Sequence, residues 1–449
     1  MATTYLTRTF SSPTNRNIFT WSAWVKRQNQ VSNFANALFG AYLNSNVRTV
    51  FRFNGHKLNF QDTEGSVEIL TNRLFRDVNG WYHIVLAVDT TQATASNRVK
   101  LYVNGVQETS FSTANYPAQN SNLLMGGADI HYINARNSSG SVESIADMSY
   151  SHIHFTDGTA YDPSAFGQYD ANGVWTIKTS PSVTYGNNGF FILKDGNSVT
   201  DQSGNSNNWT VVGGTLTKTE DNPSNVFATF NRLIKTPSGL SYSHGNTTLT
   251  TTNTQWEGSA TTLGATSGKW YWEAKYNTGS GIRLDIGRLP SDMRFMDNSN
   301  QSYLSYSTYG YGYQLNNTGY DYYGSNNSFT TWTTNRGNST KIYMVAVDLD
   351  NGKMWIGADG SWFNKSGTAN PVTGDDPLHD FSADLNGDPW LFGMSVEGSG
   401  GSHNANFGNG YFGTTAVASA GTNASGNGIF EYDVPTGYTA FCTKGLNGE

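Results

Sequence analysis

Hydrolysis of a glycosidic bond requires two carboxylates about 5–10 Å apart, one protonated and one ionised. The sequence contains ten glutamates, and Glu64 and Glu68 form the one close pair. That pair lies in a polar stretch whose composition is typical of a turn. We therefore predict no catalytic residues and no enzymatic activity.

His152 and His154 have a spacing that suits metal binding, since residues two apart on a strand point to the same side. A protein metal site of the zinc type needs at least three ligands, and no third ligand is apparent near them. Turns at 195–197 and 201–208 carry the Asp and Asn oxygens that calcium prefers. The same residue types also cap ordinary turns. We predict turn capping, no metal site and no cofactor.

A tyrosine-rich stretch runs from position 303 to 323 among Gly, Ser and Asn. Tyrosine offers a rigid, amphipathic contact surface, and the small polar residues adapt their hydrogen bonds to a partner. Alternating tyrosines also fit simple packing on one face of a strand, and the sequence leaves both interpretations open. The candidate ligand-binding or interface residues are Tyr303, Tyr306, Tyr309, Tyr311, Tyr313, Tyr320, Tyr322 and Tyr323.

Strands and tight turns must position these side chains. Segment 19–25 places Trp21 and Trp24 out of phase, so both faces of the expected strand are apolar. Segment 98–105 alternates apolar and polar residues before an Asn-Gly pair, and segment 341–357 has apolar runs on both sides of another. An Asn-Gly pair next to such a run is the strongest short signal of a hairpin.

Segment 269–276 has the alternation of a strand with one buried and one solvated face. The buried face is expected to carry Trp270, Trp272 and Ala274, and the solvated face Lys269, Tyr271, Glu273 and Lys275.

Composition indicates an all-β protein. Charged residues make up 14 %, against about 25 % in average proteins, while the chain has 49 Gly and 14 % aromatic residues. No window keeps a 3.6-residue period, so helices should be few and short. A chain of 449 residues suits two sandwiches, each of roughly 200–250 residues. Turn-rich segments predict domains at 1–215 and 241–449 with a linker at 216–240.

The net charge of −7 and the lack of Lys/Arg clusters argue against nucleic acid as a partner. The single cysteine, Cys442, cannot form an internal disulfide. The first residues lack the pattern of a secretory signal, and no apolar run approaches the length of a membrane span. We therefore expect synthesis in a cytoplasm and no membrane insertion.

The C-terminal half resembles the SPRY domain family through four blocks in the expected order. These blocks are residues 267–273, 345–355, 404–408 and 435–442. SPRY domains are interaction modules, so this resemblance implies a sandwich that binds protein or glycan.

The N-terminal half is similar to laminin G and other concanavalin A-like lectin domains, on segments 19–25, 81–89 and 100–105. A further series resembles segments of bacteriophage structural proteins. It comprises residues 155–158, 166–167, 186–190, 201–209, 221–223 and 227–229.

Together these resemblances imply two concanavalin A-like antiparallel β-sandwich (jelly-roll) domains in tandem, in a virion protein such as a head or tail fibre, knob or decoration protein. Its expected partners are other virion proteins and a host-surface glycan or protein, and the family leads us to expect a homo-oligomer. Two alternatives stay open: a polysaccharide depolymerase on the virion, and a cellular SPRY or lectin-type interaction protein. Fold alone does not decide among them.

Overall fold

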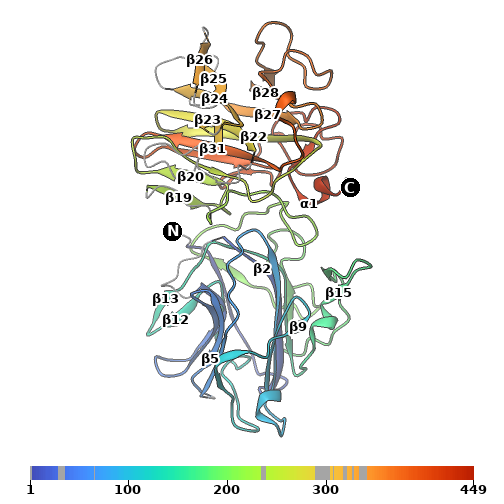
Figure 1. Cartoon of the computed structure of the whole chain (residues 1–449). Coiled ribbons are helices and arrows are strands. Elements are labelled where there is room, and N and C mark those ends of the chain that lie inside the picture. The colour runs from blue at the N-terminus through green and yellow to red at the C-terminus, as the bar shows by residue number, and fades with distance from the viewer. Residues whose placement is uncertain are drawn as a thin grey trace. The chain divides into compact units, whose positions relative to one another are not determined.

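The computed structural model describes residues 3–28, 36–64, 66–233, 239–288, 304–306, 308–316, 321–325, 328–332 and 341–448 (Figure 1). The chain divides into two compact units, Met1–Lys218 and Thr219–Glu449. Both are built from sheets that are antiparallel apart from one short parallel pair in the second unit. The helices in the described ranges are short 3-10 turns and one α-helix, α1 (Thr443–Leu446). The prediction of an all-β chain with two sandwich domains is confirmed.

In the described part of the N-terminal unit, two sheets form the layers of the sandwich. The first has the order β10 (Phe111–Asn115), β6 (Val67–Thr71), β5 (Lys57–Asp62), β4 (Arg48–Asn54), β3 (Asn36–Tyr42), β11 (Ile130–Ile133), β1 (Tyr5–Thr9), β18 (Thr210–Val212). The second has the order β17 (Phe190–Ile192), β14 (Met148–Asp157), β2 (Ile18–Arg27), β7 (Trp81–Asp89), β8 (Val99–Val103), β9 (Val106–Gln107).

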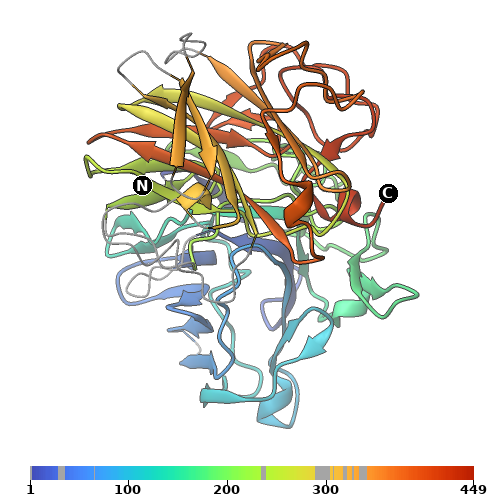
Figure 2. The same ribbon diagram turned by 45° about the horizontal axis from the view of Figure 1, so that its top comes forward.

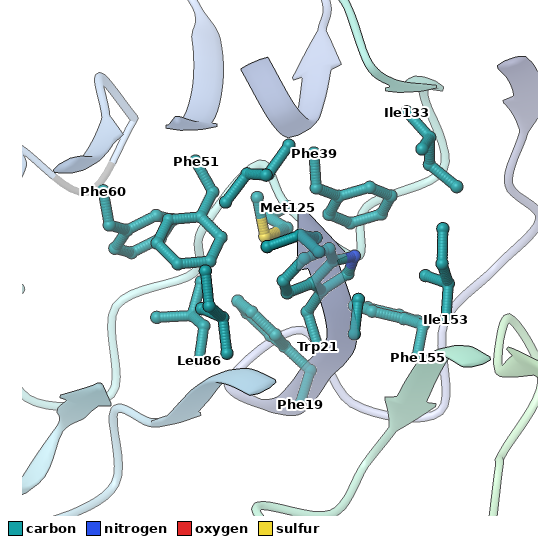
Figure 3. Packing of buried hydrophobic residues seen from close by; sticks show 14 of the residues in the cluster. Phe19, Trp21, Phe39, Phe51, Phe60, Leu86, Met125, Ile133, Ile153 and Phe155 are labelled. Atoms are coloured by element: carbon teal, nitrogen blue, oxygen red, sulfur yellow. The ribbon is translucent and has the colours of Figure 1, made fainter. Parts of the chain in front are cut away.

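The core of this unit is packed between these sheets, and aromatic side chains from both meet there (Figure 3). The Trp21 ring lies edge-on to Phe51, with centroids 5.4 Å apart, and stacks near Phe39 at 6.3 Å. Trp24, three residues along β2, points to the opposite face and is also buried. Both faces of β2 are therefore apolar, as its sequence predicts.

The Asn104-Gly105 pair forms the hairpin turn between β8 and β9. Asn104 has φ +49° and Gly105 φ +80°, the two left-handed conformations of a type I′ turn. The corresponding pair Asn351-Gly352 joins β27 (Ile342–Asp348) to β28 (Lys353–Ala358). The sequence predicted both hairpins correctly.

The C-terminal unit also has two main sheets in its described part, seen from a second side in Figure 2. One has the order β19 (Leu240–Ser243), β20 (Thr248–Thr251), β32 (Ser402–Asn406), β22 (Lys269–Thr278), β27, β28, β29 (Ser361–Trp362), with β30 (His379–Asp380) on β28 and β35 (Thr439–Ala440) on β22. The other has the order β21 (Glu257–Ala260), β31 (Trp390–Glu397), β23 (Gly281–Arg288), β24 (Gly310–Asn316), β25 (Asp321–Ser325), β26 (Ser328–Trp332).

The outer face of β22 differs from its prediction. Trp270, Trp272 and Ala274 lie in the core as expected, but Tyr271 and Glu273 on the other face are also fully buried. Residues from far along the chain cover them, with Phe430 in edge contact with Tyr271 at 4.9 Å. The alternation within a strand shows which residues share a face, but it does not show whether later segments of the chain cover that face.

The segment predicted as a linker, 216–240, is largely part of the C-terminal unit. Phe230 is fully buried against Phe407, with ring centroids 5.3 Å apart, and the Ala228 N–H donates to the Phe441 carbonyl at 2.9 Å. The boundary between the units therefore lies at Lys218–Thr219. The turns of this segment alternate with buried aromatic residues, so its turn-rich composition does not mark a linker.

A small hairpin covers part of the outer face of the sheet that contains β2 and β7. It follows the 3-10 turn η2 (Pro163–Ala165) and consists of β15 (Gly167–Tyr169) and β16 (Trp175–Ile177), labelled in Figure 1 at β15. Asp162 caps η2, and Asp170 closes the hairpin turn by accepting the Asn172 and Val174 N–H groups at 2.9 and 2.8 Å.

Candidate functional site

A pocket of about 490 Å³ opens between this hairpin and the tip of the β8–β9 turn. Its size lies within the usual range of small-ligand sites, about 300–1,000 Å³. Three aromatic residues, three glycine or proline residues and four polar or charged residues line it: Tyr102, Tyr169, Trp175, Gly105, Gly167, Pro163, Asp162, Ser164, Gln168 and Lys178. We call this cavity the Trp175 pocket.

Trp175 and Tyr169 form the aromatic wall of the pocket. They are cross-strand partners in the β15–β16 hairpin, and their rings meet edge to face with centroids 4.9 Å apart. Tyr169 is 55 % exposed, so it presents its ring to solvent without support from the core. Exposed aromatic rings with polar neighbours are typical of ligand-binding surfaces.

Two glycines make room for the Trp175 indole. A Cβ atom at Gly105 would lie 2.5 Å from Cε3 of Trp175, and one at Gly167 would lie 2.5 Å from its Cζ2. No side chain other than hydrogen fits either position while the indole stays in place. The Asn104-Gly105 turn therefore closes the β8–β9 hairpin and also leaves room for the Trp175 indole.

His83, on β7, positions the Trp175 side chain. The Trp175 Nε1–H donates to His83 Nδ1 at 3.0 Å, and the two rings stack with centroids 5.8 Å apart. An indole N–H can only donate, so Nδ1 must be the unprotonated nitrogen, and Nε2–H donates to the Ser22 hydroxyl at 2.9 Å. Trp24 stacks on the same imidazole, with ring centroids 5.0 Å apart. Burial lowers the pKa of His83 to about 3, so the ring stays neutral.

Polar groups lie around the aromatic wall. One oxygen of Asp162 accepts from the Ser164 N–H and hydroxyl at 2.8 and 2.5 Å. Lys178 Nζ donates to the Ser164 carbonyl at 2.6 Å. Burial and the nearby Asp162 charge raise the pKa of Tyr102, which keeps its phenol protonated as a donor. The arrangement offers donors and acceptors to a ligand seated on the two rings.

The tyrosine stretch is divided by the structure. Tyr303 and Tyr320 lie outside the described residues, and the side chain of Tyr306 does too. Tyr313 is fully buried in the core, with Tyr343 at 6.0 Å. Tyr309 lies against the Arg288 guanidinium at 3.6 Å.

The other tyrosines of the stretch are half-buried. Tyr311 donates a hydrogen bond to Asp384 and stacks on Phe381, and Tyr323 packs edge-on to Trp332 at 5.4 Å. Tyr322, on the opposite face of β25, pairs in register with Gln314. The alternative of strand-face packing describes Tyr311, Tyr313 and Tyr323. A role in ligand binding for the remaining residues stays a prediction.

His152 and His154 both pack on Phe191, with ring centroids 5.5 and 4.0 Å away. The chain bulges here, with His152 at φ +50°, so the strict two-residue alternation assumed from the sequence is broken. His154 Nδ1 lies 3.0 Å from the Tyr185 hydroxyl, and the His152 Nδ1 lies 2.8 Å from the Ser151 hydroxyl. Across the described residues, no three metal-ligating side chains gather.

The Asp-rich turn at 201–208 is held by its own hydrogen bonds. Asp201 accepts from the N–H groups of Phe191, Ser203 and Asn207, each at 2.8 Å, and from the Ser203 hydroxyl at 2.7 Å. These four bonds use both carboxylate oxygens for capping.

The two candidate carboxylates lie in different elements: Glu64 lies in the predicted turn, but Glu68 lies in a strand, which corrects the prediction that both lie in a turn. Glu64 forms an ion pair with Arg16 at 2.6 Å, while Glu68 lies within β6 opposite Gln61. The buried Glu273 accepts hydrogen bonds from the Glu431 and Tyr432 N–H groups, each at 2.9 Å. These bonds attach the segment around Glu431 and Tyr432 to strand β22.

Sequence reasoning missed the Trp175 pocket. The local signal was the Asp170–Gly173 turn, which pairs Tyr169 with Trp175 across a short hairpin. Nothing in the sequence reports that His83, some 90 positions earlier, lies beneath this hairpin.

Comparison with known proteins supports the fold of the first unit. Residues 2–146 match the family model of the concanavalin A-like lectin/glucanases superfamily, laminin G type. The N-terminal unit thus has a concanavalin A-like domain, and the η2–β15–β16 segment follows the matched residues. No curated protein shows significant sequence similarity to the chain.

Solved structures similar to the chain include two SPRY domains. The TRIM65 PSpry domain has 14 % identity and a TM-score of 0.29, over 40 % of this chain and 91 % of that one. The SPRY domain of human HERC1 has 12 % identity and a TM-score of 0.28, over 39 % of this chain and 96 % of that one. Within the described ranges, helices of the length and apolarity needed to cross a membrane are absent.

Proposed function

We propose that this protein is a non-enzymatic binding protein of a bacteriophage particle, and that its concanavalin A-like unit binds a host-surface glycan in the Trp175 pocket. The observation that carries the glycan assignment is the aromatic wall of Tyr169 and Trp175 beside Asp162, Gln168 and Lys178. The C–H face of a sugar ring is apolar and packs on aromatic rings, and its hydroxyls need donors and acceptors around the edge.

Binding without cleavage is supported by the carboxylates of the pocket. Asp162 is the one carboxylate among its described lining residues, and one of its oxygens already accepts two hydrogen bonds from Ser164. Hydrolysis needs a second carboxyl group across the sugar ring.

The phage context is supported by the sequence resemblance of segments between 155 and 229 to virion structural proteins. In this proposal the protein is a fibre, knob or decoration protein in contact with other virion proteins. Mass spectrometry of purified phage particles tests the assignment. Finding the chain in particles supports it, and finding it only in uninfected cells contradicts it in favour of a cellular interaction protein.

Binding to purified host-surface polysaccharide tests the glycan assignment, with Tyr169→Ala as the test variant. Leu43→Ala is the matched control, since Leu43 is 53 % exposed against 55 % for Tyr169 and lies outside the pocket. We expect Tyr169→Ala to weaken binding about tenfold and the control to leave it unchanged. New reducing ends in the polysaccharide would reveal a depolymerase instead, and unchanged binding by Tyr169→Ala would exclude this pocket.

A further inference from the structure

We infer that the glycan bound in the Trp175 pocket is built from uncharged sugars, and that the pocket discriminates against uronic acids. This inference rests on the proposed function and names the ligand class of the same site. It follows from the charges and hydrogen-bonding capacity of the side chains that surround the aromatic wall.

The charges of the pocket cancel. Asp162 and Lys178 both form hydrogen bonds with Ser164. Asp162 accepts from the Ser164 N–H and hydroxyl, and Lys178 donates to the Ser164 carbonyl. One carboxylate and one ammonium thus lie beside the same lining residue, and the chain as a whole carries −7. An anionic sugar gains no net attraction there, because its approach to Lys178 also brings it to Asp162.

The hydrogen-bonding groups also favour hydroxyls. The Asp162 carboxylate can only accept, the Lys178 ammonium can only donate, and the protonated Tyr102 phenol and the Gln168 amide do both. A sugar hydroxyl donates and accepts, so it can satisfy any of these groups. A ligand carboxylate only accepts, and it cannot pair with Asp162.

Pairs of oligosaccharides that differ only at C6 provide the test: galactose against galacturonic acid, glucose against glucuronic acid, and mannose against mannuronic acid. Isothermal titration calorimetry with the full chain measures both members of each pair. We expect the neutral member to bind about fivefold tighter or more in the pair that the pocket accepts. Asp162→Asn should narrow this difference, because it removes the repelling charge while Asn still caps η2.

The outcomes separate the two proposals. Equal or tighter binding of the acidic member, lost in Tyr169→Ala, overturns the preference for neutral sugars and leaves the glycan site standing. Binding of either member that Tyr169→Ala leaves unchanged places the sugar elsewhere and contradicts the proposed function. A preference for the neutral member that Asp162→Asn does not alter overturns the charge argument.

Discussion

The indole N–H of Trp175 donates to a histidine that is fully buried and neutral, His83, at 3.0 Å. The pocket wall is therefore attached to the sheet beneath it by one directed hydrogen bond and a ring stack. Because His83 accepts through Nδ1, it must donate through Nε2, and Ser22 is the acceptor. The tautomer, the orientation of Trp175 and the shape of the pocket are linked.

Replacing His83 with Phe tests this link. The substitution keeps an aromatic ring between Trp24 and Trp175 but leaves the Trp175 N–H and the Ser22 hydroxyl without their imidazole partner. We expect the free energy of unfolding of the N-terminal unit to fall by about 1–3 kcal/mol, and glycan affinity to fall with it.

Ser22→Ala is the control for this variant, and urea denaturation measures the stability of both variants. It removes only the Nε2 partner, so a loss of about 1 kcal/mol and unchanged glycan affinity are expected. If His83→Phe retained full glycan affinity, His83 would not be what positions Trp175.

Gly105→Ala should distort the pocket directly, since its Cβ would lie 2.5 Å from the Trp175 ring. Gly173→Ala is a close control: its φ is +78° against +80°, and nothing lies within 4 Å of its Cβ. The control should cost about 1 kcal/mol of stability from backbone strain alone. Gly105→Ala should cost roughly a further 1–3 kcal/mol, because the added methyl group meets the Trp175 ring. Equal losses in thermal denaturation would show that Trp175 is not confined by this turn.

Much of the fold could be predicted because local sequence determines it. The alternation of 98–103 and the Asn104-Gly105 pair fix a hairpin by themselves, and Trp21 with Trp24 shows that β2 is covered on both sides. The burial of Tyr271 and Glu273 could not be predicted, because the covering residue Phe430 is some 160 positions away.

The Trp175 pocket has the same limitation. It combines Tyr102 and Gly105 with residues 162–178, and only the pairing of distant segments brings them together. The tyrosine stretch shows the converse. Its composition suggests a binding loop, yet Tyr313 faces the core because β24 pairs with β23 in the sandwich.

Acid should destabilise the N-terminal unit. Burial lowers the pKa of His83 and His131 to about 3, that of His152 to about 4, and that of His154 well below its ordinary value. These histidines stay neutral in the folded chain, while in the unfolded chain they take up protons below pH 6.5. Their contribution is complete above pH 6.5 and is lost as the pH falls, by up to about 2 kcal/mol each at pH 5.

The C-terminal unit should respond less to acid. His379 and His403, with pKa values lowered by burial to about 4, act in the same direction as the histidines above. Burial raises the pKa of Glu273 and Asp285 to about 7, so these two contribute stability at low pH that is lost as pH rises through 7. Between pH 7 and 5, the stability lost through the two histidines is offset by the stability gained through Glu273 and Asp285.

Differential scanning calorimetry at pH 7 and pH 5 measures this difference. Gly105→Ala identifies the N-terminal transition, since it should lower that transition alone. We expect the N-terminal transition to shift down by more degrees than the C-terminal one. A larger shift of the C-terminal transition would contradict these assignments.

Chelation should leave the melting temperature unchanged, because hydrogen bonds within the 201–208 turn already use both oxygens of Asp201. Asp201→Ala, by contrast, should lower the stability of the N-terminal unit by about 1–3 kcal/mol, since it removes the acceptor of four donors. A drop of several degrees with EDTA would indicate a bound cation, because an ion that binds only the folded state stabilises it.

The most direct measurement of the central claim is the indole N–H spectrum of the protein labelled with ¹⁵N-tryptophan. The chain has twelve tryptophans, and Trp175→Phe identifies the resonance of Trp175 by its disappearance. Titration with host-surface polysaccharide should shift the Trp175 resonance first and most, with a smaller change at Trp24 behind His83. A bound polysaccharide that leaves the Trp175 resonance in place would contradict the assignment of this pocket as the glycan site.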